Sequence, residues 1–68
     1  MAHYYVNTNA QPTGEHEVHR DGCSNPPQPQ HRRSLGEHAN CQSAVRAAGQ
    51  IYSNVDGCKF CSPACHTR

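Results

Sequence analysis

Three cysteines and a histidine stand within DGCKFCSPACH at residues 56–66. Cys58 and Cys61 form a C-x2-C pair, in which the two intervening residues turn the backbone so that both thiolates face one point. Zinc prefers four tetrahedral sulfur or imidazole ligands, so this pair predicts half of a zinc site. Thioredoxin-like redox sites share the spacing but need a helix that opens at the motif. Pro63, two residues after Cys61, argues against that context.

The other half of the site is predicted upstream, in HRDGC at residues 19–23. His19 and Cys23 are spaced as H-x3-C, and the turn formers Asp21-Gly22 lie between them. If both pairs meet, a Zn2+ ion joins an N-terminal hairpin to the C-terminal segment. The predicted metal ligands are His19, Cys23, Cys58 and Cys61.

The prediction that His19 is a ligand depends on the geometry of the strand that carries it. Neighbouring residues of a strand point to opposite faces, and Val18 is expected to point into the core. His19 can therefore bind metal only if the strand ends or bulges there. Otherwise His19 is a solvated strand histidine.

Residues close behind the C-x2-C pair compete for the fourth ligand position. Cys65 is the second choice, and His66 adjoins it. If neither binds the metal, Cys41 and Cys65 are left over. Cys41 then serves as a small buried hydrophobe, or the two form a disulfide in an oxidising setting. Nucleophilic catalysis by Cys65 with His66 is not expected, because adjacent residues do not readily hydrogen bond through their side chains.

The elements that must position these ligands are short. A β-hairpin is predicted from two stretches. HYYVNT at residues 3–8 is rich in aromatic and β-branched residues, and EHEVHR at 15–20 shows the loose alternation typical of a strand. The proline-rich stretch at 24–31 predicts an extended loop, and RRSLG at 32–36 predicts a third short strand.

A single helix is predicted to start after Asn40, whose side chain can cap the free amides of the first turn. An apolar stripe with helical spacing follows and continues to Ile51 or Tyr52. Gly49 weakens this helix, and SNVDG at 53–57 is interpreted as a turn that leads into Cys58.

Composition predicts that the chain is either partly disordered or held together by a cross-link such as a metal. The chain has 68 residues, 34% of them hydrophobic, no Trp and a mean hydropathy of -0.93. Ordering each residue costs about 1.5 kcal/mol, which so thin a core does not easily offset. Structural zinc contributes roughly 10–16 kcal/mol at neutral pH. We therefore predict one α+β domain over residues 1–68, stapled by zinc, with the hairpin packed on the helix.

Charge and hydropathy narrow the function. The net charge is +1 and the pI about 7.7, so no strong field gathers nucleic acid or an anionic membrane. The N-terminal residues lack the pattern of a secretory signal, and no stretch is apolar enough to span a membrane. We expect a cytoplasmic monomer. Four basic residues are candidate nucleic-acid contacts: Arg20, Arg32, Arg33 and Lys59.

The order of the ligands resembles that of the Ada-type metal-binding domain. H-x3-C, a variable loop, SLGEHANCQSAVRAA, a turn and C-x2-C follow one another over residues 19–61. The resemblance implies a small α+β fold, places Cys23, Cys58 and Cys61 on zinc and suggests a short bacterial protein of this type. In the DNA-repair members, the first cysteine of C-x3-C accepts a methyl group from a DNA phosphotriester. His19 occupies that position here and cannot replace a thiolate, so methyl transfer is not expected.

These features predict a structural-zinc module without catalytic activity that binds nucleic acid or a protein partner. Two alternatives stay open. One is a thiol-disulfide or metal-handling protein, and the other is a small disulfide-stabilised domain without metal.

Overall fold

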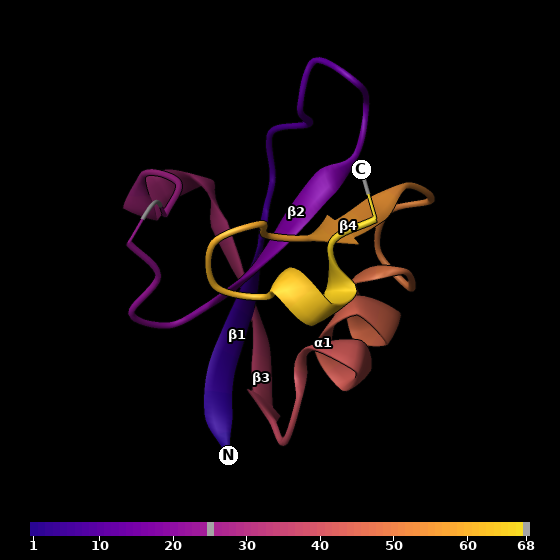
Figure 1. The fold of residues 1–68 in the computed structure, drawn as a ribbon. Coiled ribbons are helices and arrows are strands. Elements are labelled where there is room, and N and C mark those ends of the chain that lie inside the picture. The colour runs from indigo at the N-terminus through magenta and orange to yellow at the C-terminus, as the bar shows by residue number, and fades with distance from the viewer. Residues whose placement is uncertain (25, 68) are drawn as a thin grey trace.

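The computed structural model describes residues 1–24 and 26–67 and is a small α+β domain (Figure 1). Over these residues a mixed sheet contains four strands in the order β3-β1-β2-β4. They are β1 (Ala2–Asn7), β2 (His16–Arg20), β3 (Arg32–His38) and β4 (Val55–Gly57). Helix α1 (Cys41–Ala48) lies between β3 and β4 in the chain and packs on one face of the sheet.

The predicted hairpin is confirmed, with strand bounds that differ by one residue. β1 and β2 pair antiparallel in a regular register, which matches Tyr5 with His19 and Val6 with Val18. Gly14 takes a φ of 100° in the connecting turn, a value that suits glycine. The hairpin is therefore the centre of the sheet, with β3 beside β1 and β4 beside β2.

The third predicted strand exists and is longer than predicted, because β3 continues through His38. It pairs antiparallel with β1, and the register shifts between Tyr4 and Tyr5. Gly36, which pairs with Tyr4, has a φ of 83°. A glycine at this irregularity lets the strand bend without steric cost.

The interpretation of residues 53–57 as a turn is wrong for the last three of them. Val55–Gly57 form β4, which runs parallel to β2 and pairs Val18 with Gly57. A strand of three residues is too short to show alternation in the sequence. Its partner β2, distant in sequence, supplies the hydrogen bonds that a local pattern cannot reveal.

Helix α1 begins where the sequence indicates, since the Asn40 side chain accepts a hydrogen bond of 2.9 Å from the Ser43 amide. The predicted end at Ile51 or Tyr52 lies too far along the chain. The helix ends at Ala48 with Gly49 as its C-cap, and Tyr52 lies beyond it, stacked on His16 at 3.7 Å between ring centroids. The low helix propensity of glycine outweighs the apolar spacing that continues past it.

Both faces of the sheet carry buried residues. Tyr4, Val6 and Val18 pack with Ala44 and Ala48 of α1. Strand alternation places Tyr5 and His19 on the opposite face, where both are also buried. The condition that the strand must end or bulge at His19 is therefore wrong. The pairing of β1 with β2 stays regular at this residue and continues to Arg20. His19 can point away from Val18 and still be buried, because the second face of the sheet is also covered.

No helix in the described ranges is long and apolar enough to cross a membrane.

Candidate metal centre

The first two candidate ligands come from the end of β2 and the turn that follows it. His19 lies in the strand, and the chain then reverses through Asp21 and Gly22. Gly22 has a φ of 90°, and the Cys23 amide donates a hydrogen bond of 3.1 Å to the Arg20 carbonyl. This tight turn returns the Cys23 side chain toward the strand that carries His19.

The second two candidate ligands come from the segment after β4. Because β4 runs parallel to β2 and pairs Gly57 with Val18, the next residue, Cys58, arrives beside His19. The Cys58 amide donates to the Val18 carbonyl at 2.9 Å, which continues the ladder by one bond. The Ser62 amide then donates to the Cys58 carbonyl at 2.8 Å, and this turn brings Cys61 back to the same point.

The structure thus brings together the residues that the two spacings select. One ligand atom from each of His19, Cys23, Cys58 and Cys61 lies within 4.8 Å of every other. The Cys23 and Cys58 sulfurs are 3.7 Å apart, and the Cys61 sulfur is 3.9 Å from His19 Nδ1. With metal–sulfur bonds of about 2.3 Å, a tetrahedral site has edges of about 3.8 Å. The cluster has the size and donor types of a site for zinc or another soft divalent ion.

Without metal, the imidazole already has the protonation state of a ligand, whereas the Cys58 and Cys61 thiols do not. Burial, and secondarily the charge of Arg32, lowers the pKa of His19 to about 4, which keeps its imidazole neutral. Burial raises the pKa of the Cys58 thiol and raises that of Cys61 to about 12. A metal must therefore displace protons from these thiols when it binds. The raised pKa values argue against a reactive redox thiolate, since such sites lower the thiol pKa.

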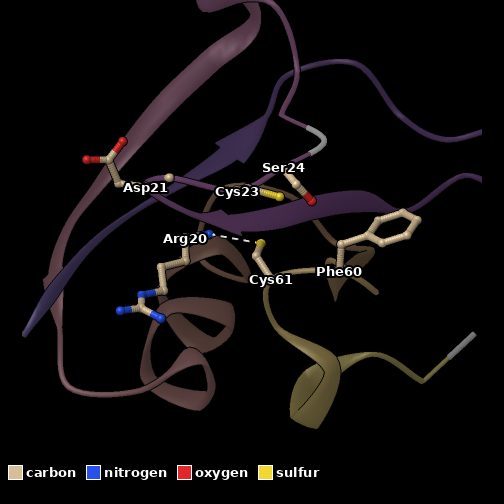
Figure 2. Close-up of a pocket in the computed structure, with 7 residues that line it drawn as sticks. Arg20, Asp21, Cys23, Ser24, Phe60 and Cys61 are labelled. Atoms are coloured by element: carbon tan, nitrogen blue, oxygen red, sulfur yellow. Dashed lines mark hydrogen bonds between the residues drawn. The ribbon is translucent and has the colours of Figure 1, made fainter.

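Neighbouring groups orient the ligands. The Arg20 amide donates to the Cys61 sulfur at 3.2 Å (Figure 2). His19 Nε2 lies 3.7 Å from Glu17 Oε1, and the Gln11 amide group donates to that same oxygen at 3.1 Å. The carboxylate therefore lies on the side of the ring nitrogen that does not point toward the sulfurs, the position that the outer partner of a metal-binding histidine takes.

Sequence reasoning missed Glu17. Glu17 lies two residues before His19, so strand alternation places the two side chains on one face. That i, i+2 relation is the signal that could have found it.

One side of the cluster opens into a surface hollow of about 310 Å³. Cys23 and Cys61 line it, and Figure 2 shows both sulfurs beside the end of β2. Arg20, Ser24 and Phe60 form other parts of its wall. Cys58, in contrast, is buried. The cluster is therefore reachable from solvent through two of its three sulfurs.

The alternative ligands lie elsewhere. Cys65 forms a disulfide with Cys41, the pairing that the sequence left open. The 3-10 turn Pro63–Cys65 carries Cys65 toward the core beside α1, away from the cluster. His66 Nδ1 lies 3.0 Å from the Gly57 carbonyl oxygen and 3.4 Å from Asp56 Oδ2. Neither Cys65 nor His66 therefore belongs to the metal cluster.

The four candidate nucleic-acid contacts are all exposed. The Arg32 guanidinium lies 5.0 Å from the centre of the Tyr5 ring, and its Nε donates to the Pro27 carbonyl at 2.9 Å. Arg33 is the next residue of the same strand and so points to the opposite face. Arg20 borders the hollow, and Lys59 is adjacent to Phe60 in the C-x2-C turn.

A separate row of polar side chains crosses β1 and β3. Ser34 Oγ lies 2.9 Å from His3 Nε2, and His3 Nδ1 lies 3.3 Å from Glu37 Oε2. This connectivity is that of a hydrolytic triad, but the His3 and Glu37 side chains are 41% and 55% exposed. Such groups act strongly only in a site from which water is excluded. We interpret the row as a surface hydrogen-bond network.

Comparisons with protein-family models, with curated proteins and with solved structures found no match. The likeness to the Ada-type domain thus rests on the order of the ligands. The structure itself shows a small α+β domain with a His/Cys tetrad that could hold a metal ion.

Proposed function

We propose that this chain is a structural-zinc module that acts by binding a partner and has no catalytic activity. The observation that carries the proposal is the convergence of one imidazole and three thiols within 4.8 Å. Their donor set is Cys₃His, which is common in structural zinc sites. The cluster ties the hairpin to the C-terminal segment, and its thiol chemistry suits zinc better than magnesium or calcium.

Native mass spectrometry of protein purified without added metal tests the zinc site. We expect one zinc ion per chain, lost after incubation with a chelator and absent from Cys61→Ser and His19→Ala. His66→Ala is a matched control, because it removes an imidazole outside the cluster and should keep the zinc. A metal-free chain, or zinc retained equally by Cys61→Ser and His19→Ala, would refute the site. A metal-free chain that keeps its disulfide would favour the disulfide-stabilised alternative.

The surface beside the hollow is where we propose to test for a partner. Phe60 is 62% exposed, and Figure 2 shows its ring extending away from the Cys61 sulfur. An exposed aromatic ring, next to Lys59 in the chain and at a hollow that Arg20 also lines, offers stacking and charge to a single-stranded nucleic acid. The edges of the hairpin, by contrast, pair with β3 and β4. The hairpin therefore offers no free strand edge to a protein partner.

Fluorescence anisotropy with a labelled single-stranded oligonucleotide separates the two partner classes. Nucleic-acid binding predicts affinity that falls steeply with salt and is lost in Phe60→Ala and Lys59→Ala. Arg33 was a candidate contact, but it lies on the other side of the sheet, so Arg33→Ala is the control and should change affinity least. Absence of binding at low salt would refute nucleic acid as the partner and leave a protein.

A metal-handling protein is the second candidate. One observation favours it: Cys23 and Cys61 line an open hollow, so a competing thiol can approach two ligands. This alternative predicts transfer of zinc to a chelator within seconds, whereas a structural site should release zinc over hours. Stopped-flow absorbance with a chromogenic chelator distinguishes the two.

A further inference from the structure

Two cross-links hold the same short segment of this chain. Cys58 and Cys61 belong to the His/Cys tetrad, and Cys65 forms the disulfide with Cys41. In Figure 1 the yellow segment leaves the end of β4 and turns back beside α1. The disulfide that fixes the position of Cys65 therefore also restricts the movement of Cys58 and Cys61.

The cross-links act on opposite faces of the sheet. The tetrad includes His19, which lies on the face opposite Val18. Cys41 is part of the core that contains Val18, and Cys65 packs against that core. The segment thus passes around the β4 edge of the sheet and is fastened once on each side.

The part of the segment between the cross-links is tightly folded. The Ser62 amide donates to the Cys58 carbonyl at 2.8 Å, and the Cys65 amide donates to the Ser62 carbonyl at 3.0 Å. A Cβ atom placed on Gly57 would lie 2.6 Å from the Cys65 Cβ. Cys65 is therefore packed directly on the backbone that precedes Cys58, and the two cannot move independently.

We propose that the redox state of the Cys41–Cys65 disulfide controls the affinity of the tetrad for zinc, a regulation that rests on the proposed zinc site. The disulfide form holds Cys58 and Cys61 near their binding positions, so zinc does not have to order the segment by itself. Reduction by two small thiols yields the Cys41 and Cys65 thiols and one external disulfide. It frees the segment, and zinc then binds more weakly.

The coupling must be reciprocal. If the disulfide strengthens zinc binding by some factor, zinc stabilises the disulfide against reduction by the same factor. Couplings between two sites are typically between about 5-fold and 150-fold, and we expect about 10-fold here. For a two-electron couple, a 10-fold factor lowers the reduction potential by about 30 mV.

The first test measures zinc affinity by competition with a chromogenic chelator, before and after reduction with a phosphine. The phosphine is oxidised to its oxide, with oxygen from water, as the disulfide becomes two thiols. We expect affinity to fall about 10-fold on reduction. Cys41→Ala/Cys65→Ala is the control. Its zinc affinity should match that of the reduced protein and should not change when the phosphine is added.

The second test titrates the disulfide in glutathione buffers, with and without zinc, and scores it by mass after alkylation. Zinc should shift the midpoint toward more reducing buffers in the native chain. Cys23→Ser removes a ligand outside the shared segment, and its midpoint should not respond to zinc.

The outcomes separate the two proposals. Zinc binding of equal affinity in both redox states, with a midpoint that zinc does not shift, overturns the coupling while the zinc site stands. Absence of zinc binding in both states overturns the zinc site and the coupling together.

Discussion

On the helix side of the sheet, Val6 and Val18 are fully buried against Ala44 and Ala48. On the other side, the buried residues of the central strands are Tyr5 and His19, and three cysteine sulfurs lie close to the imidazole. The helix side is apolar, and apart from Tyr4 its buried side chains are small. We call the other face the metal side because it carries the His/Cys tetrad; in place of apolar side chains it has groups that a single ion could bind together.

With the proposed ion bound, this difference would explain how so small a chain can order two faces of one sheet. Alanine packing buries little area, and each square ångström contributes only about 25 cal/mol. A coordinated ion contributes much more stabilising free energy at a single site. The disulfide reinforces the helix side, where Cys41 and Cys65 join α1 to the C-terminal segment. Substitutions on the two sides should therefore differ in the size of their effects.

The largest effect is expected on the metal side. Cys58→Ser removes a buried ligand, and structural zinc contributes roughly 10–16 kcal/mol. We expect loss of cooperative thermal unfolding by circular dichroism, both in this variant and in the chelated native chain. Added zinc should restore the transition only in the native chain. A cooperative transition in the chelated protein would show that the helix side suffices.

Loss of the disulfide should have the next largest effect. Cys41 and Cys65 are 24 positions apart, and closure of a loop of this size stabilises the folded state by about 3 kcal/mol. Urea unfolding of zinc-saturated Cys41→Ala/Cys65→Ala should show this loss as a lower midpoint. An unchanged midpoint would mean that the metal alone fixes the segment.

A smaller effect is expected from Glu17→Gln, which keeps the size of the side chain but removes its charge. Outer-shell partners of metal-bound histidines typically change metal affinity by about 10-fold to 100-fold. We expect zinc affinity to fall by about 10-fold, and the cobalt(II) absorption bands of the site to shift. Glu37→Gln, whose carboxylate lies on β3 near His3, is the control. Equal affinities for Glu17→Gln and the native chain would exclude this role.

The smallest effect should come from the helix cap. Asn40→Ala removes the side-chain acceptor of the Ser43 amide, which costs about 1 kcal/mol. The urea midpoint should fall slightly while zinc stoichiometry stays at one. A loss of zinc in this variant would show that α1 and the metal side are more tightly joined than the comparison of the two faces implies.

The sequence by itself determined the elements whose signals are local. The hairpin follows from strand-forming residues around a Gly-containing turn, and α1 starts at Asn40 because an asparagine side chain can cap free amides. The two short spacings and the preference of zinc for four soft ligands predicted the grouping of Cys23 with Cys58 and Cys61, whereas His19 competed with Cys65 and His66 until the fold brought it to the three cysteines.

Only the tertiary structure decided the rest. β4 exists because β2 lies beside it in parallel register, and no local pattern of three residues carries that information. His19 is buried within a regular strand because the second face of the sheet is also covered, a property of the whole fold. The pairing of Cys41 with Cys65 likewise depended on where the chain turned after Ser62. In each case the deciding contact joins residues that are far apart in sequence.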